Sequence, residues 1–334
     1  MTASFSLQGR SRPGGGPGAI APAAGTPVSA TPVPGWRMLA RAGVQIPFNL
    51  AAPILDRVRE KRGRFGMDGD PRAIMPVLEA LLRPVPDVSR VLRGARCLEL
   101  GPGRTANVAI ALHLLGARQV TSIDVRTPPA LTPAAIESTL DCLVGPAGER
   151  LRRDCGASSD ELRARAQQLR SGARTIAFGR YDGAHIGAPR DAFDVVVSKS
   201  VLEHVAPDRV DPLLQELRRT AAPGALMSHW IDFRDHMHIK SDFETEGDWL
   251  EFLAYPGWLY RLMYSKRIVG VNRLRHREWA HAFAGAGFES VADETLVHPL
   301  PPGFSPARLR PPWSTMPPAE FGRSQAIMVL RCPS

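Results

Sequence analysis

The sequence predicts an α/β protein built on a doubly wound, mostly parallel seven-stranded sheet. From residue 96 onward, short apolar runs rich in β-branched residues alternate with segments of helical periodicity. Such alternation implies right-handed crossovers that place helices on both faces of a parallel sheet. The first apolar run ends in Gly101-Pro102-Gly103, a turn typical of ligand sites at the carboxyl ends of parallel strands.

The segment before this alternation predicts a leader and a helical cap. Residues 1–35 hold six prolines and seven glycines with few bulky apolar side chains, which predicts a disordered leader. Residues 36–94 predict the cap. Its first part is amphipathic but interrupted by Pro47 and Pro53, so we expect a pair of short helices. Basic residues at 57–64 leave a membrane surface or an acidic partner as the alternative. A further helix is expected over 71–84, starting at Pro71.

Residues 95–334 predict the main domain. Its strands are expected at 96–100, 119–125, 174–178, 193–198, 225–233, 289–297 and 325–331, and its helices at 107–115, within 133–171, at 212–220 and at 276–285. Eight prolines between Pro299 and Pro318 predict an extended surface loop before the last strand.

An insertion at about 241–275, here called the lid segment, follows the fifth strand. It holds five of the ten Trp and Tyr residues of the chain within sixteen positions. A loop of this length in a compact domain is usually functional, so Trp249 and Trp258 are candidates for stacking on an acceptor molecule. Arg273, or alternatively Arg275, is a candidate for binding an acidic acceptor. The alternatives are that the aromatic residues only seal the core and that Arg273 is a solvated residue at a helix start.

The residues around the first turn indicate a nucleoside cofactor. Asp124 lies 23 residues after Gly101 at the end of the second strand, where a carboxylate can accept both hydroxyls of a ribose. The turn also satisfies the dinucleotide pattern G-x-G-x-x-A, but Pro102 removes a backbone donor that a pyrophosphate needs. Glu99 would repel a pyrophosphate and suits an ammonium group. The charges therefore favour S-adenosylmethionine over a dinucleotide.

With these residues, the chain from about 96 to 331 resembles the class I S-adenosylmethionine-dependent methyltransferases. Cys97–Gly103 (CLELGPG) looks like their first motif, with Thr105 in place of its third glycine. The resemblance implies a Rossmann-like fold and S-adenosylmethionine as cofactor. It implies further contacts from Asp182 and Gly183 to the adenine and from Ser198 and Lys199 to the methionine part. Phe193–Val205 (FDVVVSKSVLEHV) and Leu217–Ala225 (LRRTAAPGA) match later motifs. As alternatives, Glu99 pairs with an arginine, and Asp124 and Asp182 only cap local turns.

Catalytic candidates cluster after the fifth strand, in the segment His229–His238. A hydroxyl acceptor needs a general base within hydrogen-bonding reach, and we expect His236 to be that base. The adjacent Asp235 is expected to orient the imidazole and raise its pKa. His204 is a second candidate, although Glu203 and His204 also suit a helix start. A metal site made of Asp232, Asp235, His236 and His238 matches no standard spacing, so no metal is predicted.

Composition guides the choice of acceptor and location. The net charge is +9, but only four of the 42 basic residues are lysines and the arginines are scattered. A dedicated nucleic-acid arm would gather them. We therefore expect O-methylation of a small molecule or glycan. An RNA or protein methyltransferase and a non-catalytic partner-binding module are the alternatives. Four cysteines without a CxxC pair, no apolar run of membrane-spanning length and no signal-like N-terminus predict a cytoplasmic protein without a transmembrane segment.

Overall fold

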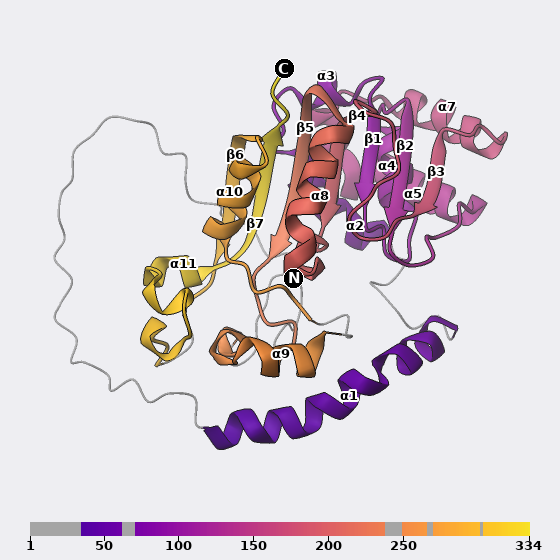
Figure 1. The fold of residues 1–334 in the computed structure, drawn as a ribbon. Coiled ribbons are helices and arrows are strands. Elements are labelled where there is room, and N and C mark those ends of the chain that lie inside the picture. The colour runs from indigo at the N-terminus through magenta and orange to yellow at the C-terminus, as the bar shows by residue number, and fades with distance from the viewer. Residues whose placement is uncertain (1–34, 62–70, 238–248, 266–269, 301–302) are drawn as a thin grey trace, which may run out of the picture.

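The sheet has seven strands in the order β3-β2-β1-β4-β5-β7-β6 (Figure 1). The computed structural model describes residues 35–61, 71–237, 249–265, 270–300 and 303–334. All neighbouring strands are parallel except β7, which is antiparallel to both β5 and β6. The strands are β1 (Arg96–Leu100), β2 (Gln119–Asp124), β3 (Ile176–Arg180), β4 (Phe193–Lys199), β5 (Ala221–Asp232), β6 (Glu289–Val297) and β7 (Arg323–Arg331). The predicted doubly wound, mostly parallel fold is confirmed.

The order of the strands determines where a ligand can bind. The chain runs from β1 outward through β2 to β3 and then returns to place β4 on the other side of β1. Strand order thus reverses between β1 and β4, and a crevice is expected beyond their carboxyl ends. Both strands are apolar and deeply buried, as parallel strands covered on two faces must be.

Helices cover both faces of the sheet, as Figure 1 shows. One face packs against α2, α4, α5 and α7, and the other packs against α8 and α10. The helices are α1 (Gly35–Lys61), α2 (Pro71–Leu82), α3 (Val88–Leu92), α4 (Asn107–Leu114), α5 (Pro133–Val144), α6 (Glu149–Asp154), α7 (Ser159–Arg170), α8 (Pro207–Thr220), α9 (Gly257–Tyr264), α10 (His276–Gly285) and α11 (Pro318–Gly322). Helix α8 begins five residues before its predicted start because Pro207 occupies its first position and Pro212 is accommodated within it.

The N-terminal helix differs from its prediction. Instead of two short helices, α1 is a single helix that continues through Pro47 and Pro53. A proline removes one backbone hydrogen bond, but here the turns on either side continue the helix. Helix α1 contacts α9 of the lid segment, where the Asn49 side chain donates a hydrogen bond to the Leu262 carbonyl at 2.9 Å. The predicted leader lies outside the described residues except for Gly35.

The proline-rich segment is also folded rather than extended. It forms η4 (Pro306–Arg308), η5 (Trp313–Thr315) and α11. Its apolar side chains pack with those of the lid segment in a core separate from the sheet, here called the lid cluster. The buried members of the lid cluster are Ala42, Trp249, Leu250, Phe252, Leu253, Ala254, Tyr255, Leu259, Tyr260, Met263, Tyr264, Val271, Leu309, Trp313, Met316 and Phe321. The segment folds despite its prolines because its large apolar side chains become buried in the lid cluster. An extended surface loop would leave more of their area in water.

The two parts of the predicted cap therefore differ in what they cover. Met75 and Leu78 of α2 belong to the core that covers one face of the sheet, whereas Ala42 of α1 belongs to the lid cluster. Among the described residues, no helix has both the length and the apolarity needed to cross a membrane.

Candidate functional site

The turn between β1 and α4 brings bare backbone to the place where the strand order predicts a crevice. Gly101 and Gly103 have φ values of 71° and 64°, a region that favours glycine. A Cβ added at Gly101 would lie 2.3 Å from Cγ2 of Val201, so the segment after β4 packs directly on this backbone. A Cβ added at Gly103 would meet nothing within 4 Å. Gly103 therefore faces open space that a ligand can enter, with Pro102 between the two glycines.

Glu99 is a buried carboxyl group at the end of β1. It is 4% exposed, and it accepts a hydrogen bond from Ser122 Oγ at 2.7 Å. Burial, with a smaller contribution from the charge of Asp124, raises the pKa of Glu99 to about 7. The arginine partner of the alternative interpretation is not among the described contacts of Glu99. A ligand cation beside Glu99 would stabilise its charged form.

Asp124 joins the end of β2 to the glycine turn. Its Oδ2 accepts a hydrogen bond from the Gly103 amide at 3.3 Å, and its Oδ1 accepts one from the Arg126 amide at 2.8 Å. The structure thus brings Asp124 and Gly103 together, 21 positions apart in the chain. The carboxylate is 9% exposed, at the edge of the crevice.

Asp182 and Gly183 lie after β3, at the outer end of the same edge. The Asp182 carboxylate accepts hydrogen bonds from the Ala184 amide at 2.8 Å and the His185 amide at 2.7 Å. These hydrogen bonds, with one to the His185 ring, hold the pKa of Asp182 well below its usual range. Gly183 has a φ of 90°. Asp182 thus caps its own turn and remains half exposed to solvent.

The last two side chains of β4 have different surroundings. Ser198 is buried, and its Oγ lies 2.8 Å from Nδ1 of His229 inside the sheet. Its side chain is therefore engaged within the core. The Lys199 Nζ lies 5.9 Å from the centroid of the Trp230 ring. His229 is fully buried and stacks on Phe283, and burial lowers its pKa to about 3.

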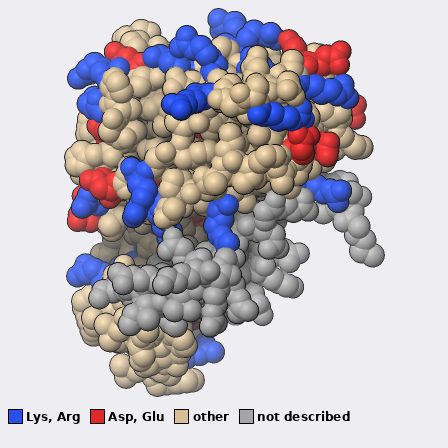
Figure 2. All heavy atoms as spheres, turned by 90° about the vertical axis from the view of Figure 1, so that its right-hand side faces the viewer, with Lys and Arg blue, Asp and Glu red and all other residues tan. Residues whose placement is uncertain are grey.

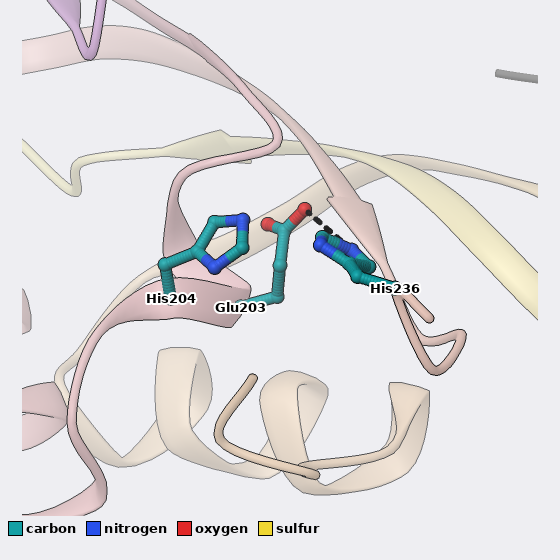
Figure 3. A group of neighbouring side chains, drawn as sticks. All are labelled: Glu203, His204 and His236. Carbon is teal, nitrogen blue, oxygen red and sulfur yellow. Dashed lines mark ion pairs between the residues drawn. The ribbon is translucent and has the colours of Figure 1, made fainter. Parts of the chain in front are cut away.

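Three ionisable side chains from two loops meet beyond β4 and β5. Glu203 and His204 lie on η2 (Leu202–His204), and His236 follows β5. One nitrogen or oxygen atom from each lies within 4.8 Å of the other two. Figure 3 shows the Glu203 carboxylate beside the two imidazole rings. His236 Nε2 is 4.0 Å from Glu203 Oε1, and the two ring centroids are 4.7 Å apart.

Burial sets the charge state of this group. Both carboxylate oxygens of Glu203 are buried, and neither has a hydrogen-bond partner among the described residues. Burial, reinforced by the charge of Asp232, raises the pKa of Glu203 well above its ordinary value. Burial and the neighbouring His204 lower the pKa of His236 to about 3. Glu203 and His236 therefore both favour their neutral forms in this structure.

Asp235 does not contact the His236 ring that it was expected to orient. Its carboxylate accepts hydrogen bonds from Arg41 Nη2 at 3.3 Å and from the Met237 amide at 3.0 Å. The carboxylates that face His236 are instead those of Glu203 and Asp232, each at 4.0 Å from Nε2. The expected rise in the pKa of His236 is wrong because desolvation of the ring outweighs the nearby negative charge. His238 lies outside the described residues.

The lid residues separate into buried and exposed sets. Trp249 is 2% exposed and lies inside the lid cluster, where no ring face remains for an acceptor in this conformation. The Arg273 guanidinium lies between the rings of Tyr260 and Trp313, at 4.4 and 4.8 Å from their centroids. It also donates a hydrogen bond to the Tyr255 carbonyl at 2.9 Å, so Arg273 binds the lid cluster together. Trp258, at 60% exposed, is free of that cluster.

Sequence reasoning missed two residues of this region, Glu203 and Asn272. Asn272 lies after α9, near the end of the lid segment, and contacts η2. Its Nδ2 donates hydrogen bonds to the carbonyls of Leu202 at 2.8 Å and Val205 at 3.0 Å. Its amide donates to the Glu203 carbonyl at 2.7 Å. Glu203 was expected only to start a helix, although it lies beside His204 and five residues after the predicted fourth strand, and Asn272 was given no role of its own.

A reversed strand order, a glycine turn after β1 and an acid at the end of β2 define a Rossmann-like, nucleoside-binding class of enzyme. The family model described as a methyltransferase domain matches residues 70–293. The chain therefore belongs to this family of methyltransferases, within class I of the S-adenosylmethionine-dependent enzymes.

Several solved structures are similar to this chain. One is an S-adenosylmethionine-dependent methyltransferase from Mesorhizobium loti, with 18% identity, a TM-score of 0.43, and coverage of 80% of this chain and 100% of that one. Another, from Methanosarcina mazei, has 14% identity, a TM-score of 0.41, and coverage of 74% and 97%. The cyclase SpnF has 16% identity, a TM-score of 0.41, and coverage of 88% and 96%. No curated protein matches.

Proposed function

We propose that this protein transfers a methyl group from S-adenosylmethionine to an oxygen atom of a small molecule or glycan in the cytoplasm. The observation that carries the cofactor part is the grouping of Glu99, Gly103 and Asp124 around one turn. When bound, S-adenosylmethionine supplies a methyl group on a positively charged sulfur. The remaining chemistry belongs to the protein.

The crevice fits a phosphate-free, positively charged nucleoside. The absence of a Cβ at Gly103 leaves the space that such a ligand needs. In this proposal Asp124 accepts the ribose hydroxyls, and Glu99 balances the ammonium group of the methionine part. Gly101 and Pro102 shape the turn. A pyrophosphate is disfavoured because it would place negative charge beside Glu99.

The adenine and the methionine part of the cofactor are proposed to contact other residues at the same edge of the sheet. Asp182 and Gly183 are proposed to meet the adenine, because they follow β3 and are accessible. Ser198 and Lys199 are proposed to line the methionine part. The Ser198 side chain is engaged with His229, so its contribution comes from the backbone.

On the acceptor side, the protein must hold a hydroxyl against the methyl group in a water-poor site. His236 and His204 are the proposed groups that face this hydroxyl. His236 Nε2 is buried without a hydrogen bond among the described residues, so its lone pair can face the hydroxyl. Burial lowers the pKa of this ring to about 3, which makes it a weak base in the ligand-free structure. Asp235 contributes by fixing the segment that carries His236, through Arg41 and the Met237 amide. Of the two lid tryptophans we assign contact with an acceptor to Trp258, because its ring is exposed, whereas Trp249 and Arg273 support the lid from within.

The distribution of charge supports a small acceptor over a nucleic acid. In Figure 2, lysine and arginine side chains are spread over the visible face with acidic side chains among them. A nucleic-acid site gathers its basic residues into a patch or stripe. The free state of all four cysteines fits the proposed cytoplasmic location.

Calorimetric titration tests the cofactor assignment. We expect the wild-type protein to bind S-adenosylhomocysteine and not to bind a nicotinamide dinucleotide. Asp124→Ala is expected to weaken the affinity at least about tenfold, since it removes a charge-assisted hydrogen bond of about 1.5–3 kcal/mol. Asp160→Ala, at an exposed site on α7, serves as the matched control and should change nothing. Preference for the dinucleotide, or unchanged binding by the Asp124 variant, would overturn the assignment.

A second assay addresses the acceptor. Incubation with methyl-labelled S-adenosylmethionine and a panel of hydroxylated small molecules and glycans is expected to label an oxygen atom. Binding of an RNA acceptor would instead fall steeply with salt concentration. Labelling of RNA or protein alone would refute the proposed acceptor class and leave the cofactor assignment intact.

A further inference from the structure

We infer that Glu203, His204 and His236 bind a divalent transition-metal ion on the acceptor side of the crevice. The inference rests on the proposed function only for what the ion would do, because the case for binding rests on these three side chains. It replaces the expectation that no metal is used. It also gives His236 a different task, that of a ligand rather than a free base.

The geometry brings three ligand atoms to one point. The atoms lie within 4.8 Å of one another, and His236 Nε2 is 4.0 Å from Glu203 Oε1. Two ligands of one tetrahedral ion lie about 3.4 Å apart, given metal–ligand bonds of about 2.1 Å. Small rotations of the side chains would close the difference. In Figure 3 the Glu203 carboxylate and the two rings, which are in edge-to-face contact with each other, lie close together.

The Glu203 carboxylate lacks the partners that burial demands. It is 2% exposed, yet neither oxygen has a hydrogen-bond partner among the described residues. His236 Nε2 is likewise buried without a hydrogen bond. A buried polar atom without a hydrogen bond is destabilising, and more so when it carries a charge. A cation held between these atoms would satisfy all of them at once.

His204 is already arranged as a metal ligand would be. Its Nδ1 lies 2.9 Å from the Gly270 carbonyl, which can only accept a hydrogen bond, so Nδ1 carries the proton. The lone pair of the ring is therefore on Nε2. Histidines that bind metals usually donate their other ring N–H to a carbonyl or carboxylate in this way.

The backbone that carries Glu203 and His204 is held in place from outside η2. The Asn272 side chain donates hydrogen bonds to the carbonyls of Leu202, the first residue of this helix, and of Val205, just after it. The Asn272 amide donates one to the Glu203 carbonyl. Gly270 and Asn272 therefore connect the end of the lid segment to two of the three ligands. Asp232, held by Arg234 and 4.0 Å from His236 Nε2, adds negative charge beside the site. Such support from neighbouring groups is typical of metal sites.

The ligand set limits which metals fit. Two imidazoles and one carboxylate suit Zn²⁺, Mn²⁺, Fe²⁺, Co²⁺ or Ni²⁺, whereas Mg²⁺ and Ca²⁺ prefer oxygen ligands throughout. Three protein ligands leave at least one coordination position open. An acceptor hydroxyl that took this position would lose its proton to water more readily. Its oxygen lone pair would then form the bond to the methyl carbon as the carbon–sulfur bond breaks, and the electron pair of that bond would stay on sulfur.

Metal content gives a direct test that needs no acceptor. Untagged protein is treated with a chelator and dialysed against Zn²⁺, and bound metal is measured by mass spectrometry. We expect one bound ion per chain. Glu203→Gln and His236→Ala are each expected to weaken Zn²⁺ binding at least about 100-fold, because each removes a direct ligand. His281→Ala, which removes an exposed histidine on α10, is the matched control and should bind as the wild type does.

A second measurement guards against variants that fail to fold. Glu203→Gln keeps the shape of the side chain, and binding of S-adenosylhomocysteine reports that its crevice is intact. Co²⁺ bound to the wild type should show visible absorption bands that His236→Ala changes. The inference would be overturned if the wild type bound no Zn²⁺, or if Glu203→Gln and His236→Ala bound Zn²⁺ as tightly as the wild type does. Methyl transfer at full rate by metal-free protein would refute the role given to the ion and leave the proposed function in place. Metal binding without S-adenosylhomocysteine binding would support the metal site and refute the proposed function.

Discussion

Replacing Glu99 by glutamine should make the ligand-free protein more stable at neutral and alkaline pH. Glu99 is 4% exposed, and burial raises its pKa from 4.5 to about 7. The folded protein therefore holds the Glu99 proton more tightly than the unfolded chain does. As pH rises above 4.5, Glu99 ionises in the unfolded chain, and this stabilises the unfolded chain. The folded protein is stabilised in the same way only above pH 7. Glutamine never ionises and keeps an oxygen that can accept the hydrogen bond from Ser122.

The size of this effect follows from the shift in pKa. A difference of about 2.5 units corresponds to about 3 kcal/mol at 1.36 kcal/mol per unit. The stability that the protonated carboxyl confers is complete below pH 4.5 and is lost as pH rises through 7. Glu99→Gln should therefore exceed the wild type by about 1 kcal/mol at pH 5 and by about 3 kcal/mol at pH 8.

Urea unfolding of chelated, cofactor-free protein at a series of pH values measures this difference. Bound S-adenosylhomocysteine must be removed, because its ammonium group would lower the pKa of Glu99 and hide the effect. Glu149→Gln, at an exposed position in the first turn of α6, is the control and should follow the wild type at every pH. The reasoning fails if the advantage of Glu99→Gln does not widen between pH 5 and pH 8.

Three further perturbations test the turn, the lid and the cap. Gly103→Ala should cost about 1 kcal/mol of stability for its positive φ alone, whereas Gly101→Ala should cost at least about 1 kcal/mol more because of the contact 2.3 Å away. Equal losses on urea unfolding would contradict the packing argument. Trp249→Ala should cost about 3–5 kcal/mol and open the lid to limited proteolysis, while Trp258→Ala should stay within about 0.5 kcal/mol of the wild type. The reverse order would refute the assignment of buried and exposed rings. Arg41→Met should cost about 2 kcal/mol, because it leaves the buried Asp235 carboxylate without its guanidinium partner. Thermal unfolding measures this loss. An unchanged melting temperature would mean that this ion pair does not hold α1.

The fold could be predicted because the information that fixes it is local. Each strand is a short apolar run, and each helix has its own periodicity, so element type and order follow without knowledge of distant contacts. The helix at 276–285 and the strand at 289–297 coincide with α10 and β6. The continuous helix α1 and the folded segment after β6 could not be predicted in this way. Their structure depends on packing against the lid segment, which lies far away in the chain.

The cofactor side of the site was equally accessible to sequence reasoning, because its spacing has a fixed structural meaning. Asp124 and Gly103 had to meet, since parallel neighbours end at the same edge of the sheet, and the structure places them in hydrogen-bond contact. Their contacts with a cofactor stay a prediction. The acceptor side has no such rule. Asp235 was paired with His236 because the two are adjacent, yet its partner is Arg41, which lies 194 positions away.

Arg41 connects the N-terminal helix α1 to the segment that carries His236. Its guanidinium lies 3.3 Å from Asp235 and 3.2 Å from Glu251, so one side chain of α1 contacts both the loop after β5 and the lid segment. Asp235 in turn is directly followed by His236, and its amide donates a hydrogen bond to the Trp249 carbonyl. A displacement of α1 would therefore act on His236 and on the lid together. The geometry around His236 then depends on a helix that lies outside the sheet.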